Sequence, residues 1–85
     1  MSEARQAVMK HLRQLCANDR LRAELTEHTD LMASGVLDSF GAVQLLQFVE
    51  QEFGVRIPDA DIGPEIFATA ARLGDYVEKR QAAAA

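Results

Sequence analysis

The sequence predicts an all-α fold: a small four-helix bundle with three longer helices, one short helix and a long loop between the first and second helices. Apolar residues recur at steps of three and four in separate stretches, which is the spacing of amphipathic helices. A polar stretch rich in Thr, Asp, Ser and Gly separates the first two stretches. The chain has 85 residues, enough for one small domain but too few for two cores.

The first helix is expected from Ser2 to about Ala17, where the apolar residues form a single stripe. Cys16 lies on this stripe, so a buried thiol is expected there rather than a reactive one. The segment 18–25 interrupts the helix and could add one further turn. The segment 26–35 is expected to be a loop, and apolar residues are needed to pin a loop of this length to the core. Those residues are Leu31 and Leu37.

The second helix is expected to begin at Asp38 or Ser39 and to end at Phe53. Aspartate is a favoured N-cap residue, and its charge suits the positive end of the helix dipole. Gly54 supplies the stop, because glycine readily adopts the left-handed conformation that ends many helices. Helical projection leaves Phe40 and Phe48 off the buried face. That face comprises Ala42, Leu45, Leu46, Val49 and Phe53.

The rest of the chain is expected to hold a short irregular helix within 59–67 and a last helix capped by Thr69. Residues 81–85 are expected to form a disordered tail, so that residues 1–80 make up the single domain. The predicted core consists of Val8, Leu12, Leu15, Leu31, Leu37, Leu45, Leu46, Val49, Phe53, Ile57, Phe67, Leu73 and Val77.

Composition excludes several classes of function. The net charge is -4, and between Glu24 and Glu65 the acids are opposed by Arg56 alone. Nucleic acid is therefore not expected as a partner, since phosphate binding needs a basic surface, whereas a basic protein would be attracted. An acidic surface that serves only solubility is the alternative. No membrane span or export signal is visible and the single cysteine cannot form an internal disulfide, so a monomer in the cytoplasm is expected.

The residues with reactive side chains indicate one candidate functional segment, around Ser39. His11 and His28 lack companions at metal-ligand spacing, so both are expected on the surface and no metal site is predicted. Ser39 stands at the first turn of a helix without a base to activate it, so catalysis by this serine is not expected. It could simply cap the helix. Phe40 and Val43, however, leave apolar surface beside it, rimmed by the acids Asp38 and Glu50, where a partner enzyme could dock.

The run from Asp30 to Val77 resembles the phosphopantetheine-binding carrier family, which includes acyl, peptidyl and D-alanyl carrier proteins. The matching pattern is 35–40 (GVLDSF), 43–46 (VQLL), 52–58 (EFGVRIP), 67–69 (FAT), Leu73 and 75–77 (DYV). The resemblance implies that Ser39 receives 4'-phosphopantetheine from coenzyme A, delivered by a magnesium-dependent phosphopantetheinyl transferase. Asp38 would assist this transfer. The terminal thiol of the arm, and not Cys16, would then carry the cargo as a thioester.

The resemblance also implies partners and a recognition surface. An adenylating enzyme or an acyltransferase would load the carrier, and a downstream acceptor or condensing enzyme would unload it. The expected partner-binding residues on the second helix and after it are Phe40, Val43, Gln44, Gln47, Glu50 and Ile57. Many family members have leucine where this chain has Phe40, a difference that bears on which partners fit. Gln44 and Gln47 stand where fatty-acid carriers often have acidic or apolar residues, so docking would be less electrostatic.

The subtype indicated by the segment 41–46 together with Gly54 and Val55 is similar to D-alanyl and other stand-alone aminoacyl carriers. A fatty-acid or polyketide acyl carrier is the alternative within the family. A helical interaction module without a prosthetic group, in which Ser39 only caps the helix, is the alternative outside it.

Overall fold

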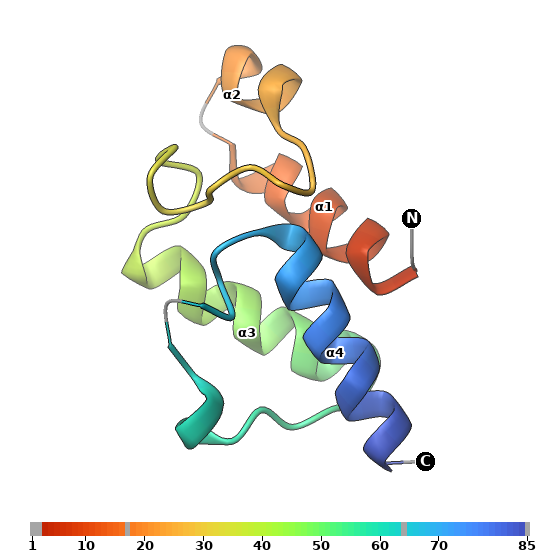
Figure 1. Ribbon diagram of the computed structural model, residues 1–85. Coiled ribbons are helices and arrows are strands. Elements are labelled where there is room, and N and C mark those ends of the chain that lie inside the picture. The colour runs from red at the N-terminus through yellow and green to blue at the C-terminus, as the bar shows by residue number, and fades with distance from the viewer. Residues whose placement is uncertain (1–2, 17, 64, 85) are drawn as a thin grey trace.

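Three helices carry the fold, as the apolar spacing predicts. They are α1 (Glu3–Leu15), α3 (Ser39–Phe53) and α4 (Ala70–Ala84) (Figure 1). The structure is a computed structural model that describes residues 3–16, 18–63 and 65–84. Over these ranges no residue is in a strand, and α1 packs against both α4 and α3. The all-α prediction is therefore confirmed. None of the described helices has both the length and the hydropathy needed to cross a bilayer.

The short helix lies earlier in the chain than predicted. It is α2 (Asp19–Glu24), and it begins because Asn18 is an N-cap whose Oδ1 accepts a hydrogen bond from the Leu21 N–H at 2.9 Å. The expected short helix within 59–67 is reduced to the 3₁₀ turn η1 (Asp59–Asp61), followed by bends and turns. The polar residues that interrupt the apolar stripe of α1 thus start a new helix, and the loop ahead of α3 runs over residues 25–38.

The ends of α3 and α4 follow from their capping residues. Gly54 has φ 63°, so α3 stops where the sequence predicts it. Thr69 Oγ1 accepts a hydrogen bond from the Arg72 N–H at 3.1 Å, which is the cap geometry expected for α4. The disordered tail expected over 81–85 is instead helical through Ala84, because a run of alanines has the highest helix propensity. Ala85, like Ser2 and Ala17 at the expected ends of the first helix, lies outside the described residues.

The core is close to the predicted one. The predicted residues that are buried are Val8, Leu12, Leu31, Leu37, Leu45, Val49, Ile57, Phe67, Leu73 and Val77, and Cys16 is buried with them. Leu15, Leu46 and Phe53 are only half-buried and pack at the edge of the core. Buried apolar residues that the prediction omitted include Ala4, Met9, Leu25, Val36, Val55, Ile66 and Ala70. These omissions lie mostly at helix ends and in loops, where periodicity gives no signal.

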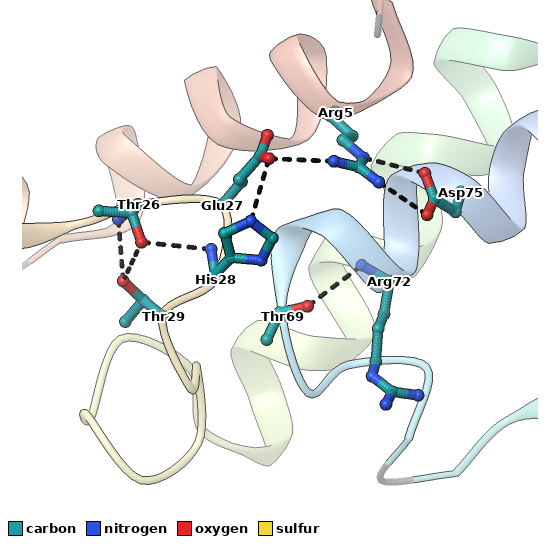
Figure 2. Close-up of polar contacts among 8 residues, drawn as sticks. All are labelled: Arg5, Thr26, Glu27, His28, Thr29, Thr69, Arg72 and Asp75. Carbon is teal, nitrogen blue, oxygen red and sulfur yellow. Dashed lines mark hydrogen bonds and ion pairs between the residues drawn. The ribbon is translucent and has the colours of Figure 1, made fainter. Parts of the chain in front are cut away.

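Arg5 joins three segments that are distant in the sequence (Figure 2). Its guanidinium donates to both carboxylate oxygens of Asp75 on α4, at 2.9 and 2.8 Å, and to Glu27 Oε1 in the loop at 3.0 Å. The hydrogen bonds from Arg5 hold the pKa of Asp75 below its usual range. Glu27 Oε1 also lies 3.2 Å from His28 Nε2, whose side chain is largely exposed as predicted. The network fixes the loop against α1 and α4.

His11 is more enclosed than the sequence suggests. Its ring stacks on Phe48, with centroids 4.3 Å apart and planes 13° apart, and both side chains are half-buried. The expectation that His11 is a surface residue and that Phe48 points away from the packed face is therefore wrong. Helical projection places Phe48 beside the buried stripe but does not show that a ring from α1 covers it. Burial lowers the pKa of His11.

Gly74 marks the closest approach of α1 and α4. A Cβ added at this position would lie 2.5 Å from Arg5 Cγ and 2.9 Å from both the backbone N and Cα of Arg5. Backbone atoms cannot move aside as the end of a side chain can, so glycine is required for the two helices to pack at this distance.

We predict that Gly74→Ala destabilises the fold. Overpacking against the Arg5 backbone should lower the free energy of unfolding by about 1–3 kcal/mol, outweighing the roughly 1 kcal/mol that alanine contributes through helix propensity. Urea unfolding monitored by circular dichroism measures this. Gly63→Ala is the matched control, because its added Cβ would meet nothing within 4 Å. A Gly74→Ala protein as stable as the parent would contradict the close packing of α1 on α4.

A second prediction concerns pH. Because burial holds the pKa of His11 in the folded state below its usual value, the unfolded state binds more protons as the pH falls below about 6.5, and the fold loses stability in that range. Unfolding free energies measured between about pH 7 and pH 5.5 should fall for the parent chain and stay nearly level for His11→Gln. His28→Gln serves as the control, because it removes the chain's other imidazole, which is 74% exposed and is not part of the stack on Phe48. An unchanged slope in His11→Gln would refute the assignment.

Candidate functional site

The loop ahead of α3 is tied to the start of α4. The Leu31 N–H donates to the Ala68 carbonyl at 3.0 Å, and the Ala71 N–H donates to the Glu27 carbonyl at 2.9 Å. The Leu31 side chain is fully buried, as predicted. These two hydrogen bonds satisfy backbone groups that a loop and a helix start would otherwise leave unpaired. The loop therefore has a fixed path toward α3.

The last residues of the loop turn the chain outward. The Leu37 N–H donates to the Leu31 carbonyl at 3.0 Å, which closes the turns of segment 31–36. Val36 and Leu37 are both buried, whereas Asp38 and Ser39 are exposed. The step from buried to exposed between neighbouring residues places the start of α3 at the surface.

Asp38 is the N-cap of α3. Its backbone is extended (φ -114°, ψ -176°), and its Oδ1 accepts a hydrogen bond from the Gly41 N–H at 2.6 Å. Its carbonyl accepts from the Ala42 N–H at 2.9 Å. The negative charge of a carboxylate at this end of a helix is favourable because the helix dipole is positive there. The cap that the sequence predicts is thus confirmed in detail.

Ser39 is the first residue of α3 and is not its cap. Its side chain is exposed, and across residues 3–16, 18–63 and 65–84 its hydroxyl has no hydrogen-bond partner. The interpretation of Ser39 as a capping residue is therefore wrong, because Asp38 already performs that role. The result is a serine hydroxyl at the surface, on a rigid helix, available to another molecule.

Four large apolar residues are exposed in the described part of the chain. Phe40 is 71% exposed and Val43 53% exposed, as the projection of the helix suggests. Met32, in the loop, and Ile62, after η1, are also large apolar residues with 46% and 42% of their surface exposed. Sequence reasoning missed these two because neither lies on a periodic stretch. A patch of neighbouring exposed apolar side chains marks an interaction site, and Phe40 and Val43 lie one helical turn apart on α3.

The other expected recognition residues behave differently from one another. Gln44 and Gln47 are exposed on α3, where a partner could reach them. Glu50 is half-buried, and its Oε2 accepts a hydrogen bond from the Ile57 N–H at 3.1 Å, so its carboxylate supports the chain after α3. Ile57 is 5% exposed, and its side chain belongs to the core. The burial of Ile57 argues against the partner contact expected of it.

The groups that could activate a serine are engaged in other contacts. His11 stacks on Phe48, well along α3, and His28 lies beside Glu27. Within the described part of the chain no three His, Cys, Asp or Glu side chains form a group that could hold a metal ion. Cys16 is buried, and its thiol donates to the Leu12 carbonyl at 3.4 Å. The geometry therefore fits a serine that receives a group through the chemistry of another protein, because it is reachable but has no base of its own.

The comparisons with known proteins agree with this geometry. Residues 10–77 match the family model described as "Phosphopantetheine attachment site", which covers most of the chain. A D-alanyl carrier protein of Abiotrophia defectiva is 34% identical over 76 residues, covering 89% of this chain and 94% of that protein.

Two further D-alanyl carrier proteins match shorter segments. The protein of Streptococcus equi subsp. zooepidemicus (strain MGCS10565) is 37% identical over 52 residues, 61% of this chain, and the match spans 66% of its own length. That of Bacillus velezensis is 34% identical over 56 residues, 66% of this chain and 69% of the relative. The extent of the family match and the exposed serine at a helix start lead to one identification. The chain belongs to the phosphopantetheine attachment site family, whose members bear a covalently attached 4'-phosphopantetheine.

Proposed function

We propose that this chain is an aminoacyl carrier, of the D-alanyl type, whose phosphopantetheine arm is attached to Ser39. The observation that carries the proposal is the exposed Ser39 hydroxyl, left without a hydrogen-bond partner among the described residues because Asp38 takes the cap. A modifying enzyme can reach such an oxygen without unfolding the domain. A cytoplasmic location, expected from the sequence, is part of the proposal.

The attachment step assigns a simple role to each residue. Ser39 Oγ forms a new bond to the phosphorus of phosphopantetheine, the bond between this phosphorus and the nucleotide part of coenzyme A breaks, and the hydroxyl proton passes to a base on the transferase. Asp38 holds the first turn of α3 in place, and its second carboxylate oxygen is free to help bind the metal ion that the transferase brings. When bound, the arm supplies a terminal thiol that carries the cargo as a thioester. The chain itself would perform no catalysis.

The proposed cargo is a small, polar amino acid, which needs no apolar cavity beside Ser39 because it is well hydrated in water. The D-alanyl carrier proteins among the relatives support the same subtype.

The partners follow from the exposed residues. Phe40 and Val43, together with Met32, would dock a transferase, an adenylating enzyme that loads the amino acid, and an acceptor enzyme that removes it. Gln44 and Gln47 add neutral hydrogen-bonding groups to this surface. Because Glu50 already accepts a hydrogen bond from within the chain, apolar burial would contribute more to docking than charge attraction.

The proposal is tested by intact-mass analysis of the chain after incubation with coenzyme A, magnesium and a broad-specificity phosphopantetheinyl transferase. The parent chain should gain the mass of one phosphopantetheine group, and Ser39→Ala should gain none. Ser34→Ala is the matched control, since Ser34 is the other described serine and lies in the loop ahead of α3. A mass gain on Ser39→Ala would show that phosphopantetheine is attached to another residue. The absence of a mass gain on the parent chain would refute the proposal.

The modified chain is then offered ATP and D-alanine with a D-alanine-adenylating enzyme. One alanyl group should be added and then released by hydroxylamine, which cleaves thioesters. Loading only by an acyltransferase with a fatty acyl group would assign the chain to the fatty-acid type instead.

A further prediction separates the two roles of Asp38. Asp38→Ala removes the cap and should lower the free energy of unfolding by about 1 kcal/mol, whereas Asp38→Ser keeps a capping oxygen and should stay close to the parent. Both variants lack the carboxylate, so both should accept phosphopantetheine more slowly if it assists the transfer. Thermal unfolding and the initial rate of mass gain give the two readouts. Normal modification of Asp38→Ser would restrict Asp38 to its capping role.

A further inference from the structure

A second charged surface lies along α4, on residues that the proposed function does not use. One hollow in the surface is lined by Arg72, Tyr76, Lys79 and Arg80. Side chains spaced by three or four residues project from the same side of a helix, so these four form one stripe along α4. Asp61, from η1, also lines the hollow. We call this surface the α4 groove.

The cations that α4 contributes to the groove have no bonded partner among the described residues. Among residues 3–16, 18–63 and 65–84, the side chains of Arg72, Lys79 and Arg80 form neither an ion pair nor a hydrogen bond. Figure 2 shows the Arg72 guanidinium directed away from the contact between Arg5 and Asp75. Arg80 Nε is buried without an acceptor, which is unfavourable for a charged donor unless a ligand or solvent supplies one.

Two of the three carboxylates that line the hollow are already engaged, and the third belongs to the exposed Glu65. Asp75 receives two hydrogen bonds from Arg5. Asp61 accepts a hydrogen bond from the Tyr76 hydroxyl at 2.5 Å, which anchors η1 to α4. The charges left open in the groove are thus mainly positive, although the chain as a whole carries -4. A basic surface on an acidic protein is not explained by solubility alone.

We propose that the α4 groove binds an acidic peptide segment of a partner protein. The open guanidinium and ammonium groups would pair with its carboxylates. The carboxylate of Asp61 can in turn accept a peptide N–H, and the ring of Tyr76 offers an apolar face. A hollow with both donors and acceptors suits a peptide, which has both, better than the flat phosphate surface of a membrane. The inference does not depend on the arm at Ser39.

The test uses the intact 85-residue chain, labelled with ¹⁵N, and an acetylated, amidated hexaglutamate peptide as the probe. The peptide should change the amide chemical shifts of residues 69–83. These changes should become smaller as the salt concentration rises from about 0.02 to 0.3 M. The double variant Arg72→Glu with Lys79→Glu should raise the Kd of the peptide about tenfold. Arg13→Glu with Arg56→Glu is the matched control, because both arginines are exposed, lie outside the groove and give the same change in net charge.

Three outcomes would overturn the inference. Amide shifts confined to other surfaces, or equal weakening in the control variant, would show that only net charge matters. The groove would be assigned to a membrane if the chain did not bind the peptide but bound phosphatidylglycerol vesicles. The double variant Arg72→Glu with Lys79→Glu would then have to lose this vesicle binding. A chain that sediments as a dimer until Arg72 and Lys79 are replaced would assign it to a second copy. Ser39→Ala should bind hexaglutamate like the parent, so failure of the carrier proposal would be seen separately.

Discussion

Two backbone hydrogen bonds between the loop and the start of α4, from Leu31 to Ala68 and from Ala71 to Glu27, position the Ser39 end of the molecule. They hold the loop in place although it contains no helix or strand. The buried side chain of Leu31 attaches the loop to the core at the same point. Because the loop is fixed, Asp38 arrives in the extended conformation that a cap requires. The exposure of the serine therefore depends on hydrogen bonds to Ala68 and Ala71, about thirty residues further along the chain.

Asp38 caps the helix and Ser39 does not, which explains how one short segment can be both rigid and reactive. If the serine hydroxyl capped the helix, its oxygen would point at backbone N–H groups and would be withdrawn from any partner. With the aspartate in that position, the serine is held by its backbone alone and its side chain stays open to solvent. A carboxylate is also the better cap electrostatically, because it complements the helix dipole.

The sequence predicts those parts of the structure that local rules decide. Apolar spacing identifies α1, α3 and α4, and the caps at Asp38, Gly54 and Thr69 give their ends. The features that the sequence does not predict depend on contacts between segments that are distant along the chain. The pairing of Arg5 with Asp75 joins residues seventy positions apart, and no local pattern signals it. The exposure of Met32 and Ile62 similarly depends on which side of an irregular loop faces outward. Such residues define much of the apolar surface, so the extent of the recognition surface required the structure.

The exposed apolar residues of α3 and the open cations of α4 lie on different helices. This separation bears on how the domain could bind more than one partner. The α3 side offers Phe40 and Val43 followed by the neutral Gln44 and Gln47, while Glu50 is turned toward the chain. The α4 side offers open cations on a groove that Tyr76 and Asp61 brace. Screening by salt does not weaken the burial of apolar surface, whereas it does weaken the pairing of exposed charges. A partner on α3 and a partner on α4 would thus be bound by different forces, so that each could exchange without displacing the other.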